Sequence, residues 1–291
     1  MAIPHLYSAV PTPLDAALRI AVAPLAQYCK TLLSQGCGGV VLFGTTGEGT
    51  FFSVPEKLAA LQDIIAEGVP PERIILASGA CALDGAAAMV MGAGEAGCSA
   101  ALVLPPFFTK QTDDEGLADW FDALIARAGS DAGILLYHIP AVAGVGFSPD
   151  LVSRLFDRHA DIMRGVKDSS ADSALARELA RRGLPGVHVS TEVGLTDNLA
   201  AGMQGTISAS LNITLPFVLR ALAGSSSEAD ATAATIRAHL IRHSLIWAVK
   251  TVLFTNTGDI AWSRLAPPHR APQDRKAFLQ ELYQLQSAGE P

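Results

Sequence analysis

Three short polar segments of this sequence carry residue types suited to carbonyl chemistry, and the first is built around a lysine. Lys167 follows a short apolar run and precedes small polar residues that begin with Asp168. A charged lysine in an apolar setting costs several kcal/mol unless it is paired, whereas a desolvated lysine becomes a neutral amine that attacks carbonyl carbons. The segment alone also fits an exposed lysine or one that is paired with Asp168.

The other two segments supply an anion site and a proton carrier. Residues 44–49 read Gly-Thr-Thr-Gly-Glu-Gly, and they offer open backbone N–H groups near Gly47 together with the hydroxyls of Thr45 and Thr46. Such a loop suits a carboxylate or a phosphate, although it lacks the sequence of a nucleotide P-loop or a dinucleotide fingerprint. Tyr137 lies inside an apolar run, where a buried hydroxyl requires a hydrogen-bond partner. Taken singly, these segments also fit a plain glycine turn and a core tyrosine.

One repeated pattern predicts how these segments are positioned. A helical run ends in glycine and an apolar strand follows almost at once, as at residues 34–44 and 95–106. Glycine ends helices because it adopts the left-handed conformation, and continuous apolar strands are typical of parallel sheets buried on both faces. The expected strands lie at residues 6–10, 39–43, 74–78, 100–104, 133–138, 163–167, 187–191 and 205–210.

Eight strands that alternate with helices predict a (β/α)8 TIM barrel, with a doubly wound open sheet as the alternative. The pattern then becomes wholly helical, with a boundary at the Gly-Ser-Ser-Ser run of residues 224–227 and a predicted helix at residues 226–241. We therefore expect a barrel catalytic domain at residues 1–223 and a helical C-terminal extension at residues 224–291 that packs on it.

Functional residues of such a barrel lie at the carboxyl ends of its strands. Lys167, Tyr137 and the glycine loop all fall there, and their convergence is harder to explain by packing than any one of them. Further polar residues at strand ends converge on the same mouth, namely His138, Thr191, Glu192, Ser208 and Ser210. The alternative for His138 is a packed histidine, and for the others a turn-capping role.

Composition narrows the class of protein. The net charge is −7 with only 21 Lys and Arg residues, so no basic surface for nucleic acid or an anionic membrane is expected. No apolar run has the length of a transmembrane helix, and the start lacks signal-peptide features. The four cysteines show no close pairing, which predicts free thiols in a cytoplasmic protein. His239 and His243 have helical spacing but no accompanying carboxylate motif, so we expect a surface pair and no metal site.

The three segments together resemble the dihydrodipicolinate synthase and N-acetylneuraminate lyase superfamily. The matching residues are 44–49, 135–144 and 165–170, in the family's order and spacing, and the resemblance covers essentially the whole chain. It implies a barrel that performs class I aldolase chemistry on pyruvate. It also implies a homo-oligomer, either a dimer or a tetramer, and no cofactor beyond the covalent lysine imine.

The resemblance assigns a role to each matching residue. Lys167 matches the lysine that forms a Schiff base with the C2 carbonyl of pyruvate, and Tyr137 matches the tyrosine that relays protons. Thr45 and Thr46, beside Gly47, match the pair that holds the pyruvate carboxylate, and the Thr45 hydroxyl also joins the relay. The imine would then stabilise an enamine that attacks an aldehyde, or the reverse reaction would cleave a 2-oxo acid.

Two positions depart from the synthase branch of that family. Val142 stands where the synthase carries an arginine, five residues after the tyrosine, and Phe108 stands where it carries a tyrosine. These departures favour a lyase or aldolase that acts on a 2-oxo sugar acid or a related 2-oxo acid. The resemblance also implies that the strand-end residues contact the second substrate, namely His138, Thr191, Glu192, Ser208 and Ser210. The alternatives are 4-hydroxy-tetrahydrodipicolinate synthase itself, a dehydratase or hydratase-aldolase, and a non-catalytic pyruvate-binding regulator.

Overall fold

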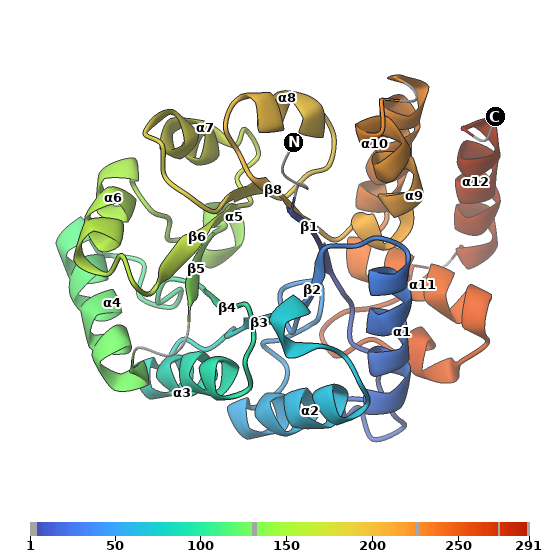
Figure 1. Ribbon diagram of the computed structural model, residues 1–291. Coiled ribbons are helices and arrows are strands. Elements are labelled where there is room, and N and C mark those ends of the chain that lie inside the picture. Colours follow the sequence, from blue (N-terminus) through green and yellow to red (C-terminus); the bar gives the residue numbers. More distant parts are fainter. Residues whose placement is uncertain (1–4, 130–132, 225–226, 273, 290–291) are drawn as a thin grey trace.

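The strands form one closed parallel barrel. The computed structural model describes residues 5–129, 133–224, 227–272 and 274–289. Each strand pairs with its neighbour in the sequence, the first strand closes the barrel against the eighth, and helices ring the outside (Figure 1). The strands are β1 (His5–Ala9), β2 (Gly39–Leu42), β3 (Ile74–Ala77), β4 (Ala100–Val103), β5 (Ile134–His138), β6 (Met163–Asp168), β7 (Val187–Val189) and β8 (Gly205–Ser208).

Helices alternate with the strands and then continue alone. They are α1 (Val22–Ser34), α2 (Val54–Ala66), α3 (Leu83–Glu95), α4 (Asp114–Ala128), α5 (Pro140–Ala143), α6 (Pro149–Arg158), α7 (Ala174–Arg181), α8 (Leu195–Ala200), α9 (Leu211–Leu222), α10 (Ser227–Arg242), α11 (Leu245–Thr257) and α12 (Arg275–Ala288). Short 3-10 turns occupy Pro71–Arg73 and Ile260–Ser263. The side chains of Ser53, Asp113 and Ser148 accept hydrogen bonds from the first turns of α2, α4 and α6, so local capping begins these helices.

Side-chain alternation along the strands separates two apolar layers. Leu135 and Tyr137 of β5 point into the barrel, whereas Leu136 belongs to the core between the strands and the helices. Val41 and Leu42 of β2 divide in the same way. The position of a residue in its strand therefore decides whether its side chain can reach the barrel interior.

The predicted TIM barrel with C-terminal helices is confirmed, and the open-sheet alternative is wrong, because the strands close. The largest differences are at β7 and β8, which end two residues before the predicted bounds. At β7 the Thr191 side chain accepts a hydrogen bond from the backbone N–H of Val193, which turns the chain. After β8 the chain enters α9 almost at once. Residue 226, the predicted start of a helix, lies outside the described residues.

The C-terminal helices pack on the barrel and on one another. α10 lies against α9 and α12, and α11 packs against α10. Figure 1 shows these helices gathered on the side of the barrel next to α1 and α9. Within the described residues, no helix is long and apolar enough to cross a membrane.

Candidate active site

Lys167 and Tyr137 meet inside the barrel. They are paired in the register of β5 and β6, and the Lys167 Nζ lies 4.3 Å from the centroid of the Tyr137 ring. Lys167 is only 5% exposed. Asp168 points to the opposite side, where its carboxylate accepts hydrogen bonds from the backbone N–H groups of Ser170 and Ala176. The alternative in which Asp168 pairs with the lysine is therefore wrong, because adjacent strand residues face opposite ways.

Tyr137 connects the lysine to the glycine loop. Its hydroxyl lies 3.2 Å from the Thr45 Oγ1, so one proton can pass between the two oxygens. Burial raises the pKa of the Tyr137 phenol, but the positive charge of Lys167 and the hydrogen bond with Thr45 outweigh it, and the net pKa is below the usual value. The phenol therefore gives up its proton more readily than an ordinary buried tyrosine would.

The glycine loop is held close to β2 by backbone contacts that only glycine permits. A Cβ on Gly49 would lie 1.6 Å from the carbonyl oxygen of Phe43, and one on Gly47 would lie 2.9 Å from the Phe43 nitrogen. Among the hydrogen bonds of the described residues, the backbone N–H groups of Thr45 and Thr46 have no acceptor. Two free donors beside a hydroxyl form a cradle suited to a carboxylate.

Glu48 ties this loop to the C-terminal extension. Its carboxylate accepts hydrogen bonds from the Lys250 ammonium and, at 2.6 Å, from the backbone N–H of Ala266. Lys250 also donates to the carbonyl oxygen of Arg264, at 2.8 Å. The ion pair is buried on both sides, because the two side chains are almost fully inaccessible. Glu48 thus fixes the segment that follows α11 against the mouth of the barrel.

A cavity of about 310 Å³ opens beside Thr45 and Tyr137. His269 of the C-terminal extension also lines this cavity, which the sequence did not predict. It lies three residues after Ala266, whose backbone N–H binds Glu48. The lining is otherwise mainly apolar and comprises Phe43, Gly44, Glu48, Thr50, Ala77, Gly79, Leu102, Leu104, Phe107, Ile139, Val142 and Ala143. His269 was missed from the sequence because nothing local marks it. In the sequence, residues 268–276 form only a small basic patch, which is typical of solvated surface.

Ser169 is a second residue that the sequence did not single out. Its hydroxyl is buried and lies near the Tyr137 phenol, whose pKa it helps to lower, but it makes no well-aligned hydrogen bond among the described residues. Because buried hydroxyls are nearly always paired, Ser169 is a further candidate contact of a bound molecule. Its position two residues after Lys167, on the same side of the strand, was the signal that could have found it.

His138 does not reach this cavity. Its Nδ1 accepts a hydrogen bond from the backbone N–H of Phe147 at 3.0 Å, and its ring packs near Phe147 on the helix side of β5. Burial lowers the pKa of His138 below its usual value, although Asp168 and Asp172 oppose this. The prediction of a shared mouth for Tyr137 and His138 is corrected, since neighbouring residues of a strand face opposite layers.

Three of the candidate contacts of a second substrate, Glu192, Ser208 and Ser210, belong to one hydrogen-bond network. The Glu192 carboxylate accepts hydrogen bonds from Ser208 at 2.6 Å and from Thr214 at 2.7 Å. Arg237 of α10 donates to Ser208, to Ser210 and, at 3.3 Å, to Glu192. These groups therefore hydrogen-bond to one another in this structure, and their contact with a second substrate stays a prediction.

His188 is the neighbour of Lys167 on β7. The two residues are paired in the strand register, and the His188 ring is buried. Burial, followed by the charge of His5, lowers the pKa of His188 to about 4, with a smaller contribution from Lys167. His188 is therefore neutral at pH 7, and it adds no positive charge beside the lysine.

Known proteins share this sequence pattern and architecture. The model of the dihydrodipicolinate synthetase family matches residues 3–255. The chain belongs to this family. The assignment confirms the resemblance inferred from residues 44–49, 135–144 and 165–170, and it makes the protein an enzyme of the class I aldolase or lyase type.

Similar proteins include sequence relatives and solved structures. An uncharacterized DapA-like lyase of Chloroflexus aurantiacus is 34% identical, over 75% of this chain and 73% of the relative. The 4-hydroxy-tetrahydrodipicolinate synthase of Parasynechococcus marenigrum is 29% identical, over 88% of this chain and 82% of its own length. The dihydrodipicolinate synthase structure from Agrobacterium tumefaciens has a TM-score of 0.87 at 29% identity and covers 99% of this chain and 100% of that one. An N-acetylneuraminate lyase of Proteus mirabilis shares the fold, with a TM-score of 0.85 at 19% identity over 97% and 98% of the two chains.

Proposed function

We propose that this family member is a pyruvate-dependent lyase or aldolase that cleaves or forms a 2-oxo acid through an imine on Lys167. The observation that carries the proposal is the contact of the Lys167 Nζ with the Tyr137 ring, whose hydroxyl reaches Thr45 at the cavity wall. A buried amine, a phenol with a lowered pKa and a cradle of free N–H groups are the parts that Schiff-base chemistry needs.

The proposed reaction begins with attack of the neutral Lys167 amine on the C2 carbonyl of pyruvate. Water leaves, and the imine nitrogen becomes an electron sink for the adjacent carbons. Loss of a methyl proton gives an enamine, which attacks an aldehyde to form a carbon–carbon bond. In the reverse direction the same bond breaks, the aldehyde departs, and the enamine regains a proton. Tyr137 and Thr45 are placed to carry the protons in these steps.

The pyruvate carboxylate would lie on the glycine loop. The backbone N–H groups of Thr45 and Thr46 have no protein acceptor among the described residues, so they are free to bind its oxygens. This places the carbonyl carbon of the substrate between the loop and β6. Gly47, held by the Thr12 hydroxyl through its carbonyl, keeps the loop in this shape.

The cavity lining favours a second substrate with an apolar part over a polyhydroxylated one. Phe107, Ile139 and Val142 line the cavity, and Val142 is 68% exposed. The groups predicted to bind a sugar-acid chain, such as Glu192 and Ser208, are engaged with each other. His269 offers the polar contact at the mouth for a carbonyl or hydroxyl of the aldehyde fragment.

The second candidate is 4-hydroxy-tetrahydrodipicolinate synthase, because several relatives carry that name. Two residues weigh against it. Val142 offers no charge for the carboxylate of an aspartate-semialdehyde partner, and Phe108, which is 85% exposed, has no hydroxyl to join a proton relay. A non-catalytic pyruvate-binding regulator is disfavoured by the retained Lys167 and Tyr137.

Trapping with borohydride tests the imine directly. The full-length protein is incubated with pyruvate and reduced, and the modified peptide is identified by mass. We expect the adduct on Lys167. Lys57 is a matched control, because it is also buried and burial lowers its pKa to about 8, yet it lies on α2 and donates to the carbonyl of Ser78. A folded protein that gives no adduct, or one modified only at Lys57, would overturn the proposal.

The identity of the second substrate needs a panel coupled to pyruvate release. The panel contains 2-oxo acids that carry an aromatic or aliphatic fragment, 2-keto-3-deoxy sugar acids and N-acetylneuraminate, and condensation with aspartate semialdehyde is measured separately. We expect the 2-oxo acids that carry an aromatic or aliphatic fragment to be turned over fastest. Preferred turnover of a sugar acid would contradict the assignment from the lining, and efficient condensation of the semialdehyde would establish the synthase.

A further inference from the structure

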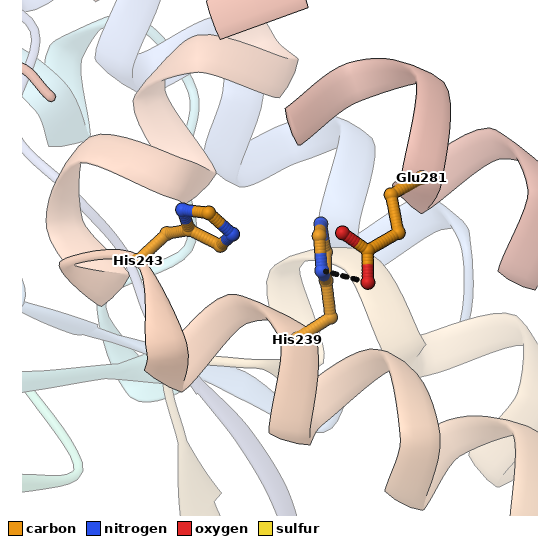
Figure 2. A group of neighbouring side chains, drawn as sticks. All are labelled: His239, His243 and Glu281. Carbon is orange, nitrogen blue, oxygen red and sulfur yellow. Dashed lines mark ion pairs between the residues drawn. The ribbon is translucent and has the colours of Figure 1, made fainter. Parts of the chain in front are cut away.

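A second cluster of ligand-type side chains lies outside the barrel, where α10 meets α12. Figure 2 shows His239 and His243 together with Glu281, which comes from α12. His239 is fully buried in the last turn of α10, and half-buried His243 follows the end of that helix. The sequence predicts a surface pair without a carboxylate. Packing of α12 corrects this, because it buries His239 and supplies the missing carboxylate.

The separations approach those of a metal site. One ligand atom from each of the three residues lies within 4.8 Å of the others, and the His239 Nδ1 is 3.3 Å from the Glu281 Oε1. Bond lengths of about 2.0–2.1 Å at tetrahedral zinc require about 3.3 Å between ligand atoms. The pair of His239 and Glu281 already has this spacing. His243 and Glu281 are partly exposed, so small rotations can bring the third atom closer.

The hydrogen bonds of His239 leave the correct nitrogen available. Its Nε2 lies 3.1 Å from the carbonyl oxygen of Phe278, which can only accept, so the Nε2 carries the proton and the Nδ1 holds a lone pair. The ring also stacks on the Phe278 ring, with 5.0 Å between centroids and an angle of 7°. A backbone carbonyl that fixes the tautomer and orientation of an imidazole is the usual support of a metal-binding histidine.

A surface arginine holds the place of a cation in this cluster. Arg242 donates to the His239 Nδ1 at 3.1 Å and to the Glu281 carboxylate at 2.7 Å. The Arg242 side chain is 62% exposed, so it has room to turn away from the cluster into solvent.

We propose that His239, His243 and Glu281 form a binding site for one divalent transition-metal ion of the zinc type. The ion takes the place of the Arg242 guanidinium, which moves away from His239 and Glu281. Two imidazole nitrogens and one carboxylate oxygen suit Zn²⁺, Co²⁺ or Ni²⁺, with water at an open position. Mg²⁺ and Ca²⁺ do not fit, because they prefer oxygen ligands. The ion would join α12 to α10, so the site is independent of the imine chemistry proposed for Lys167.

Metal binding to the full-length, tag-free and chelator-treated protein tests the proposal. Co²⁺ reports the coordination number through its visible absorption, and Zn²⁺ is then titrated by calorimetry. We expect one equivalent of either ion to bind, and the melting temperature to rise with free Zn²⁺. Glu281→Gln and His243→Gln are each expected to weaken binding at least tenfold. Arg242→Met is expected to strengthen it, because it removes the competing cation.

His159→Gln serves as the matched control. His159 pairs with Asp122 at 2.7 Å on the surface, as a histidine and a carboxylate without a second imidazole. Its replacement is expected to leave Co²⁺ and Zn²⁺ binding unchanged. The proposal is overturned if the folded wild-type protein binds no stoichiometric ion. It is equally overturned if Glu281→Gln and His243→Gln bind as tightly as the wild type.

Discussion

The Nζ of Lys167 lies over the ring of Tyr137, 4.3 Å from its centroid, inside the barrel. The aromatic face attracts the ammonium and at the same time shields it from water. The same contact brings the phenol, and through it Thr45, next to the amine. One side chain therefore orients the proposed nucleophile and carries its protons.

Replacing Tyr137 with phenylalanine separates these two roles. Tyr137→Phe keeps the ring beneath Lys167 but removes the hydroxyl that meets Thr45. We expect the pyruvate adduct still to be trapped by borohydride, while kcat falls by roughly 10²–10⁴-fold, the usual contribution of a positioned proton carrier. Thr45→Val provides a milder comparison. Unchanged turnover in Tyr137→Phe would show that protons travel by another route.

His269 offers a test of the second-substrate mouth. His269→Ala removes the polar side chain that the C-terminal extension brings to the cavity. We expect KM for the 2-oxo acid substrate to rise about tenfold, which corresponds to one lost hydrogen bond, with trapping of pyruvate alone unchanged. Steady-state kinetics and borohydride reduction give the two values. A parallel loss of pyruvate trapping would place His269 at the carboxylate cradle instead.

The buried pair of Glu48 and Lys250 predicts strong non-additivity. Glu48→Gln or Lys250→Met leaves one buried partner without its counter-charge, and each is expected to reduce the free energy of unfolding by about 3–5 kcal/mol. The double variant Glu48→Leu with Lys250→Met should lose less than the sum, because no charge remains buried. Urea denaturation at fixed protein concentration measures all the variants. Additive losses would mean that the two residues act separately.

His188 predicts a loss of stability in mild acid. Its pKa is about 4 in the folded protein, against about 6.5 when unfolded. As the pH falls below 6.5, the unfolded chain takes up a proton that the folded one rejects, so stability declines until about pH 4. The loss from this residue is about 3 kcal/mol. This loss is absent above about pH 6.5 and is complete below about pH 4.

The comparison of His188→Leu with the wild type isolates this contribution. Urea denaturation is carried out at several pH values between 7 and 4. The variant should show a flatter decline over that window, because the leucine does not titrate, while the groups that face His188, namely His5 and Lys167, are retained. Parallel curves for the two proteins would assign the acid sensitivity to other groups.

The amino-acid sequence by itself determined the barrel and the centre of the candidate site. Continuous apolar strands, glycine helix ends and capping residues such as Ser53 are local features, so the order and approximate bounds of the elements follow from short windows of sequence. Lys167, Tyr137 and Thr45 were found in the same way, because strand ends of a parallel barrel lie on one face. Alternation along β5 also contained the orientation of His138, although the expectation of a common mouth overlooked it.

Only the tertiary structure decided which side chains complete or leave the site. His269 reaches the cavity because Glu48 binds Lys250 and Ala266, which lie far along the chain. Arg237 similarly closes the network of Glu192, and Glu281 joins His239. Such contacts arise when helices after the barrel fold back on it. Local propensity and periodicity do not predict these contacts, because the energy of a long-range ion pair depends on where its partner lies in space.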